Sequence, residues 1–340
     1  MAKRKLLYLG NKASSFGGTA TTMESLAHNL KEEGYEVYSA SAKRNKLLRL
    51  ADMLRLVLQH ARTASLVLID TYSTQNFYYA VAVANLCRLL NIPYVPILHG
   101  GNLPQRLKRS PVLSNKLFNG AKCNVAPSAY LKERFEESGY SNIRCIPNAI
   151  ETDNYQFKPR SEIKPNLLWV RSFSEIYNPK LALMLVEVLN KEGYRASLCM
   201  VGPEKDGSLA ECRRIVNDRK LSVRFTGLLS KEEWKELATD YDIFINTTNY
   251  DNSPVSVIEA MALGLPVVST NVGGIPYLLS HRVDSLVVEA DDAVAMSAAV
   301  RTLLDDSILA AELSQNARKK AEEFNWEQLK HKWIQLIECE

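Results

Sequence analysis

The sequence has no long apolar run and no low-complexity segment. No stretch reaches the roughly 20 apolar residues that a membrane-spanning helix needs. The basic start at Lys3–Lys5 runs directly into Leu6–Leu9, which is too short for the core of a signal peptide. With 46% hydrophobic and 24% charged residues, the composition is that of an ordinary globular protein. We therefore expect a cytosolic protein.

Cysteine pairs at metal-ligand or redox spacing are also missing. The six cysteines stand apart from one another, with no CxxC and no Cys/His pattern: Cys87, Cys123, Cys145, Cys199, Cys212 and Cys339. Several lie inside apolar runs, where a cysteine serves as a small buried side chain. The sequence predicts neither disulfides nor structural zinc.

Acidic residues are scarce in the first half. Residues 1–150 carry 20 Lys and Arg against 9 Asp and Glu, a net charge of +11, and no acid occurs between Asp70 and Glu133. The remainder carries 22 against 29, a net charge of −7. A basic half attracts anionic lipids, phosphorylated acceptors or nucleic acids, although a plain solvated surface explains it equally well.

Short β-rich runs alternate with helical stretches along all 340 residues, which is enough chain for two domains. Near-continuous Val, Ile and Leu content in these runs predicts parallel strands covered on both faces. The predicted strands are Lys5–Leu9, Glu36–Tyr38, Ser65–Ile69, Pro93–Leu98, Cys123–Ala126, Asn142–Ile146, Leu167–Val170, Ala196–Val201, Val223–Thr226, Ile243–Asn246, Pro266–Ser269 and Ser285–Val288. The fold class is therefore α/β, with two Rossmann-like domains joined by a proline-containing linker at Pro147–Pro165.

Ligands of open parallel sheets bind at the carboxyl ends of the strands. Gly10–Thr19, with Gly17 and Gly18, follows the first strand and leaves room for a phosphate or a sugar, or is a plain flexible loop. It fits neither a dinucleotide fingerprint nor a Walker A loop. His99 ends the fourth strand and is followed by two glycines, so it is either a ligand-binding or a structural histidine.

The richest stretch is Asn249–Val268, which predicts a strand end, a polar loop, a helix beginning near Pro254 and a second strand. The N–H groups around Ser253, Pro254 and Val255 and the positive end of the helix dipole suit a diphosphate. Asp251 in the loop precedes Glu259 in the helix by eight positions. Together these acids can hold hydroxyls on both sides of that turn, or they are a cap and an ordinary helical acid.

The stretch from Asp251 to Thr270 resembles the E-x7-E motif and following strand of the family 4 (group 1) retaining glycosyltransferases. Asn271–Tyr277 resembles the glycine-rich turn of that family, and Pro147–Ile150 resembles the PNG[IV] that ends its first domain. Gly17–Gly18 and His99–Gly100 fall at the expected places. The resemblance covers essentially the whole chain.

This resemblance implies a GT-B fold, in which two Rossmann-like domains face each other across a cleft. Residues 1–150 would bind the acceptor, residues 151–323 would bind the nucleotide-sugar, and residues 324–340 would form a helix that crosses back to the first domain or packs on its own. Asn325 is a plausible N-cap of that helix.

The resemblance also assigns roles to single residues. Glu259 would bond the ribose hydroxyls, Asp251 the donor sugar, and Arg171 the diphosphate leaving group. His99 would contact the donor sugar, and Gly17 and Gly18 would border the donor phosphates and the acceptor. As a set, the resemblance implies His99, Arg171 and Asp251 as catalytic residues and Gly17, Gly18, Arg171, Lys180, Asp251, Ser253, Pro254, Val255 and Glu259 as donor-binding residues.

Two positions depart from the family pattern. Asp251 is one methylene shorter than the usual glutamate. The lysine that normally follows the arginine by about five residues is missing, and Lys180 comes nine residues after Arg171, so its contact with the phosphate is open.

We expect a hexosyltransferase-like enzyme that keeps the anomeric configuration and needs no cofactor. No Asp-x-Asp pair stands at the carboxyl end of a strand, so we expect transfer without a metal. The segment Gln105–Phe118 interleaves cations with large apolar residues and predicts a membrane-surface patch. UDP- or GDP-sugars are the expected donors, and a glycan or polyprenyl-linked acceptor of polysaccharide biosynthesis is expected, at the inner face of a membrane. Nucleic acid is disfavoured because no recognition motif accompanies the charge.

Two other functions remain open. A sugar-nucleotide epimerase of the same fold would share these residues, and so would a non-catalytic subunit that binds a nucleotide-sugar. The shortened acid and the displaced lysine are what keep the second alternative open.

Overall fold

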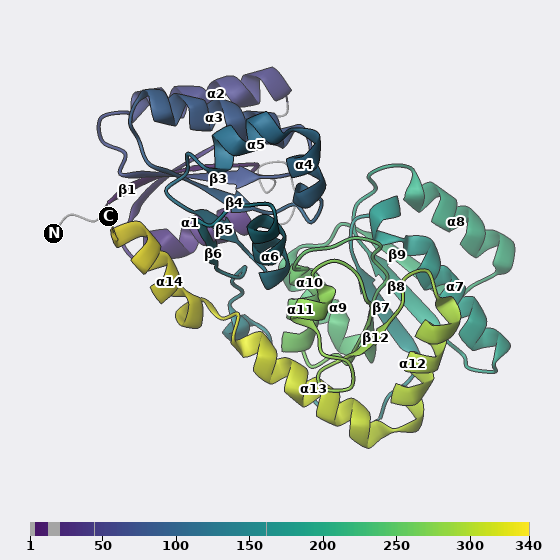
Figure 1. Cartoon of the computed structure of the whole chain (residues 1–340). Helices are drawn as coiled ribbons and strands as arrows, with labels where there is room; N and C mark the ends of the chain where they lie inside the picture. Colours follow the sequence, from purple (N-terminus) through teal and green to yellow (C-terminus); the bar gives the residue numbers. More distant parts are fainter. Residues whose placement is uncertain (1–3, 13–20, 44, 161, 340) are drawn as a thin grey trace. The chain divides into compact units, whose positions relative to one another are not determined.

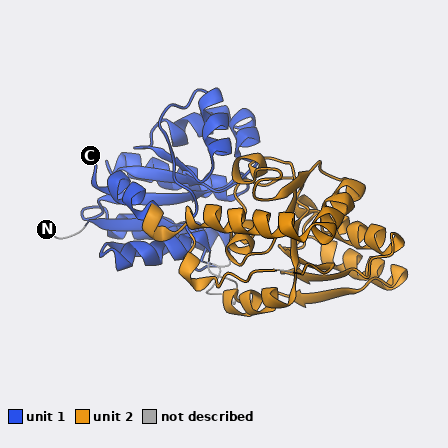
Figure 2. Ribbon diagram, turned by 90° about the horizontal axis from the view of Figure 1, so that it is seen from below, with its two compact units in different colours: residues 1–149, 329–340 blue, residues 150–328 orange. Residues whose placement is uncertain are grey.

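The computed structural model describes residues 4–12, 21–43, 45–160 and 162–339. The chain divides into two compact units, shown in Figure 2: unit 1 contains Met1–Ala149 and Leu329–Glu340, and unit 2 contains Ile150–Gln328. Each unit has its own sheet, its own helices and its own buried core.

Unit 1 is built on a six-stranded sheet of order β2-β1-β3-β4-β5-β6, and every pair of neighbouring strands is parallel. Its strands are β1 (Lys5–Leu9), β2 (Glu36–Ala40), β3 (Leu66–Thr71), β4 (Tyr94–Leu98), β5 (Asn124–Ala126) and β6 (Ile143–Cys145). Its helices are α1 (Thr22–Glu32), α2 (Lys46–Gln59), α3 (Asn76–Leu89), α4 (Leu103–Arg109), α5 (Pro111–Phe118) and α6 (Ala129–Glu137). Helices α2, α3 and α5 lie on one face of the sheet, and α1 lies on the other (Figure 1).

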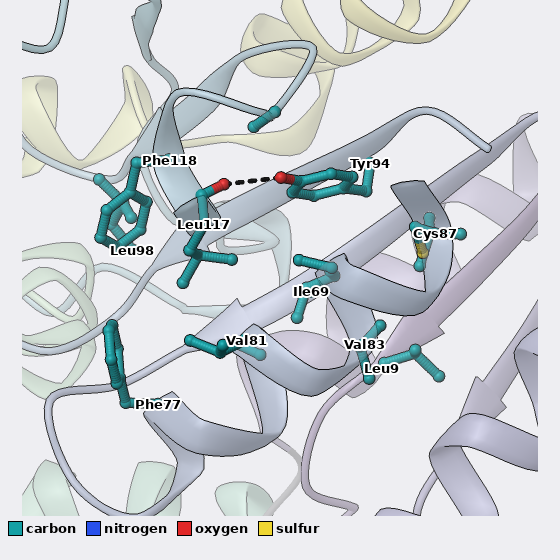
Figure 3. Packing of buried hydrophobic residues seen from close by; sticks show 14 of the residues in the cluster. Leu9, Ile69, Phe77, Val81, Val83, Cys87, Tyr94, Leu98, Leu117 and Phe118 are labelled. Atoms are coloured by element: carbon teal, nitrogen blue, oxygen red, sulfur yellow. Dashed lines mark hydrogen bonds between the residues drawn. The ribbon is translucent and has the colours of Figure 1, made fainter. Parts of the chain in front are cut away.

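The core of unit 1 lies between the sheet and the layer of α2, α3 and α5 (Figure 3). Phe118 packs edge-on against Phe135, with 5.0 Å between ring centroids. The hydroxyl of Tyr94 donates a 2.9 Å hydrogen bond to the carbonyl oxygen of Leu117, which ties β4 to the end of α5. Burial raises the pKa of the Cys87 thiol to about 12, and all six cysteines of the chain are free thiols.

The last helix, α14 (Trp326–Glu338), joins unit 1 from Leu329 onward. It begins after Asn325, whose side-chain oxygen accepts the N–H of Glu327 at 3.1 Å, as the sequence predicts for an N-cap. At its other end, Arg4 donates to the carbonyl oxygen of Ile337 at 2.9 Å, and the Tyr35 hydroxyl donates to Glu338 at 2.8 Å.

The segment Gln105–Phe118 divides its cations and apolar side chains between solvent and the core of unit 1. Within α4 and α5 the large apolar side chains of Leu107, Leu117 and Phe118 are buried. Helical spacing of three and four residues turns these side chains toward the core, while Lys108 and other cations of the segment remain exposed. Val112, in contrast, is 66% exposed, so the segment offers positive charge to solvent with some apolar surface beside it.

Unit 2 repeats the architecture with a six-stranded parallel sheet of order β12-β11-β10-β7-β8-β9. Its strands are β7 (Asn166–Val170), β8 (Ser197–Val201), β9 (Val223–Gly227), β10 (Ile243–Asn246), β11 (Val267–Thr270) and β12 (Leu286–Val288). Its α-helices are α7 (Pro179–Lys191), α8 (Ser208–Arg219), α9 (Lys231–Leu237), α10 (Val255–Ala262), α11 (Ile275–Leu278), α12 (Ala293–Asp305) and α13 (Ser307–Glu322). Short 3-10 helices occur at η2 (Thr152–Asn154), η3 (Glu175–Tyr177) and η4 (Ala238–Asp240). The two parallel α/β units confirm the predicted fold class.

The first residues of unit 2 are held to its sheet by the buried side chain of Arg160. Its guanidinium donates to five backbone carbonyl oxygens at 2.9–3.2 Å, on Lys158, Ala238, Tyr241, Leu263 and Gly264. Burial lowers the pKa of Arg160 to about 10. Of the stretch Pro147–Pro165 that the sequence suggests as a linker, residues 150–160 are thus part of unit 2.

In the described part of the chain, no helix is both long enough and apolar enough to cross a membrane.

Candidate functional site

Arg171 follows β7 at the carboxyl edge of the sheet of unit 2. Its guanidinium forms an ion pair with the carboxylate of Asp251 and lies 4.6 Å from the ring centroid of Tyr177. Only 15% of the Arg171 side chain and 13% of the Asp251 side chain are exposed. Burial lowers the pKa of Arg171 from its ordinary value. The carboxylate of Asp251 compensates the buried positive charge of the guanidinium.

Two glycines shape the loop that carries Asp251. Gly273 has φ = +55°, and a Cβ at this position would lie 2.2 Å from the carbonyl oxygen of Asp251. A Cβ on Gly274 would lie 1.9 Å from the carbonyl oxygen of Asn252, and the Gly274 N–H donates to the Asp251 carbonyl at 3.0 Å. The glycine-rich turn of the sequence therefore packs directly against the Asp251 loop, where no larger residue fits.

Helix α10 begins directly after this loop. Pro254 stands at its N-cap with ψ = 112° and provides no side-chain cap. The N–H groups of Val257 and Ile258 already bond the carbonyl of Pro254, so those of Val255 and Ser256 precede the helical ladder. Ser253, Pro254 and Val255 thus lie where the backbone and the helix dipole favour an anion.

Glu259 lies one turn into α10, and its side chain is 6% exposed. The hydroxyl of Tyr155 donates to Oε1 of Glu259 at 2.6 Å, and Nζ of Lys231 lies 3.2 Å from the same oxygen. Burial, followed by the charge of Glu259, raises the pKa of Tyr155. Nothing in the sequence marks these two partners of Glu259, because Tyr155 is 104 positions away and neither residue belongs to a motif.

Lys180 lies in the first turn of α7, and its ammonium group is 2.7 Å from Glu211 in α8. Its side chain is 41% exposed. The structure therefore pairs Lys180 with a neighbouring helix and not with the Arg171–Asp251 pair.

His99 follows β4 in unit 1, and Nε2 lies 2.8 Å from Oδ1 of Asp70 in the neighbouring strand β3. Both side chains are buried, at 6% and 2% exposed. The imidazole stacks on Tyr72, with 5.3 Å between ring centroids. A Cβ on Gly10 would lie 2.3 Å from Oδ2 of Asp70, so this glycine lets β1 end against the carboxylate.

Asp70 was not identified from the sequence, although the signal for it was present. It ends an apolar run next to the strand of His99, and parallel strands bring such residues to one edge. Gly17 and Gly18 lie outside the described residues.

Most of the predicted donor-binding residues come together in unit 2. Arg171, Asp251, the loop Ser253–Val255 and Glu259 follow the neighbouring strands β7 and β10. The set combines a cation, an uncapped helix start and a buried carboxylate, which are the groups that bind a phosphorylated ligand with vicinal hydroxyls. Among the described residues, no cluster of three or more His, Cys, Asp or Glu could hold a metal ion.

Two family models match this chain. Residues 151–320 match the model described as glycosyl transferases group 1, and residues 16–154 match the model described as glycosyltransferase family 4. The chain belongs to the group 1 glycosyltransferases.

One curated relative is the amylovoran biosynthesis glycosyltransferase AmsK of Erwinia amylovora. It is 27% identical over 269 residues, which cover 74% of this chain and 65% of the relative. The chain thus matches slightly less than two thirds of that relative's length.

Solved structures share the fold over nearly the whole chain. The sucrose-phosphate synthase of Thermosynechococcus elongatus has a TM-score of 0.82 at 18% identity and 98% coverage of both chains. Anabaena Alr3699/HepE, in complex with UDP and glucose, has a TM-score of 0.76 at 18% identity and 98% coverage of both chains. These similarities establish the GT-B fold of the chain.

Proposed function

We propose that this protein is a retaining glycosyltransferase that moves a hexose from a nucleoside-diphosphate sugar to a glycan or lipid-linked acceptor. The observation that carries the proposal is the grouping of Arg171, Asp251 and the start of α10 at one edge of the unit 2 sheet, with Glu259 one turn into the same helix. The solved structure of HepE with UDP and glucose supports a nucleotide-sugar as the ligand class.

Each group has a role that follows from its chemistry. Cleavage of the bond between sugar and diphosphate leaves negative charge on the phosphate, which the Arg171 guanidinium and the N–H groups of Val255 and Ser256 would meet. Glu259 would accept the ribose hydroxyls, and Asp251 would exchange its bond with Arg171 for a hydroxyl of the donor sugar. Arginine suits this task because its planar fork binds phosphate oxygens in pairs.

The retained configuration is part of the proposal. In this mechanism the acceptor, and no enzymic nucleophile, attacks the anomeric carbon from the face that the diphosphate leaves. The Arg171 guanidinium and the N–H groups of Val255 and Ser256 would compensate the charge of the leaving group without a metal.

Unit 1 would bind the acceptor and, through His99, contact the donor sugar. Asp70 holds Nε2 of His99 at 2.8 Å, so the other ring nitrogen, Nδ1, is the one left for a substrate hydroxyl. Gly17 and Gly18 are proposed to border the donor phosphates.

We also propose that unit 1 associates with an anionic membrane surface that carries the acceptor. The first half of the chain has a net charge of +11, with 20 Lys and Arg against 9 Asp and Glu. At the start of α2, Leu47 is 78% exposed and Leu48 is 60% exposed, directly after Lys46. Exposed leucines beside cations suit insertion at a charged lipid interface.

The proposal is tested by a thermal-shift screen against UDP-, GDP- and ADP-sugars, followed by an assay for nucleoside-diphosphate release with glycan and lipid-linked acceptors. We expect one donor to stabilise the protein and to release its diphosphate only when an acceptor is present. Isomerised sugar without acceptor would favour an epimerase. Binding without release across all acceptors would favour a non-catalytic nucleotide-sugar subunit, a result that the pairing of Lys180 with Glu211 would help to explain.

A further inference from the structure

Both groups that contact the Glu259 carboxylate reach the same oxygen. The Tyr155 hydroxyl lies 2.6 Å from Oε1 and Nζ of Lys231 lies 3.2 Å from Oε1. A carboxylate oxygen offers two lone-pair sites, and Oε1 meets two donors, a hydrogen-bonding hydroxyl and an ion-paired ammonium group. No hydrogen bond or ion pair joins Oε2 to another side chain of the described residues.

Both donors are held in place by contacts of their own. Arg318 donates to the carbonyl oxygens of Tyr155 and of Ala262, each at 2.7 Å, and so ties the backbone of Tyr155 to the end of α10. The ammonium group of Lys235 lies 5.3 Å from the centre of the Tyr155 ring. The donors therefore do not depend on a ligand for their position.

Lys231 is the first residue of α9 and follows a capping box in which Ser230 and Glu233 bond each other's backbone N–H groups. This cap fixes the start of the helix. The Lys231 side chain is 32% exposed, so it brings a positive charge to a buried carboxylate while its ammonium group keeps contact with water.

A buried carboxylate without partners is costly, and it turns toward whichever donors are near. Tyr155 and Lys231 remove that freedom, because together they fix Oε1. From this geometry we infer that Tyr155 and Lys231 are positioning residues that orient Glu259 so that Oε2 accepts the vicinal hydroxyls of the ribose. This inference rests on the proposed function, in which Glu259 binds the nucleotide.

The test measures affinity by calorimetry for UDP and for 2′,3′-dideoxy-UDP, or for the GDP pair if the screen shows that GDP is preferred. The full-length variants are Tyr155→Phe, Lys231→Met and Lys231→Arg. Lys319→Met serves as the matched control, because Lys319 is an exposed lysine in α13 of the same unit. Far-UV circular dichroism and melting curves check that each variant is folded.

We expect wild type to bind the ribonucleotide more tightly than the dideoxy form. Tyr155→Phe and Lys231→Met should each weaken ribonucleotide binding by about tenfold and leave dideoxy binding unchanged, since the first removes a hydrogen bond to the carboxylate and the second removes an ion pair with it. Lys231→Arg should recover most of the loss, and Lys319→Met should bind as wild type does. If one variant fails to fold, the other still tests the inference.

Equal weakening of both ligands would show a purely structural role and would overturn the inference, as would unchanged ribonucleotide binding in both variants. These results leave the proposed function standing. A wild-type protein that binds no nucleotide at all would overturn the proposed function and the inference together.

Discussion

Arg171 pairs with Asp251 in the structure and is proposed to pair with the diphosphate of the donor. Replacing Asp251 by asparagine removes the first partner and leaves the second. Asparagine keeps the size of the side chain, and its amide oxygen can still accept one hydrogen bond from the guanidinium, so the loss is mainly one of charge. Removing one partner of a fully buried ion pair costs about 3–5 kcal/mol. Because 15% of Arg171 remains exposed and the Tyr177 ring lies against it, we expect about 2 kcal/mol.

That loss corresponds to a fall of roughly 4–8 °C in the melting temperature of unit 2, by the scaling for domains of its size. Nucleoside-diphosphate binding should change in the opposite direction. With Asp251 neutral, no anion competes for Arg171 or repels the phosphates, so the dissociation constant for the diphosphate should fall by about tenfold. Turnover of the donor should fall by about 10- to 100-fold, because the sugar loses a charged hydrogen-bond acceptor.

Calorimetry with the nucleoside diphosphate, melting curves and a diphosphate-release assay measure these three quantities. Asp218→Asn is the matched control, since Asp218 is 62% exposed and pairs only weakly, at 3.5 Å, with Arg214. If Asp251→Asn weakened diphosphate binding as much as it slowed turnover, Asp251 would contribute to holding the phosphates, and the reasoning above would be wrong.

Three further predictions concern the loop, the core and the surface. Gly274→Ala places a Cβ 1.9 Å from the carbonyl oxygen of Asn252, so the loop must shift and turnover should fall by up to about 100-fold; an unchanged rate would refute the packing argument. Burial raises the pKa of Tyr94 to about 12, above the value of about 10 in an unfolded chain. The stability that this proton contributes is present below pH 10 and is lost as the pH rises toward 12, so Tyr94→Phe should flatten the fall of the denaturant midpoint over that range. Replacing Leu47 and Leu48 by serine should reduce sedimentation with liposomes that contain anionic lipid, and binding indifferent to lipid charge would contradict the proposed membrane association.

The fold was predictable because it depends on patterns that are local in the sequence. Continuous apolar runs placed the strands Lys5–Leu9 and Ile243–Asn246 at the bounds that the structure gives. The carboxyl-edge rule led to His99 and the Asp251 loop, because it depends only on where the strands end. Arg171 came from the resemblance to the glycosyltransferase family.

The partners of these residues were harder to predict. Contacts such as Tyr155 with Glu259 join positions 104 residues apart, and no periodicity marks them. Burial within the Gln105–Phe118 segment was equally hard to predict, because the sequence does not tell which of its apolar side chains face solvent. Helical geometry turns Leu107 and Phe118 into the core and leaves Val112 exposed.

The central claim is most directly tested by following the reaction by proton NMR, with the nucleotide-sugar that stabilises the protein most and a lipid-linked or glycan acceptor. The account predicts acceptor-dependent release of the nucleoside diphosphate and a product whose anomeric proton has the configuration of the donor. Both signals should disappear in Arg171→Ala. An inverted anomeric centre would contradict the retaining mechanism, and the absence of any transfer despite Glu259-dependent nucleotide binding would contradict the assignment as a transferase.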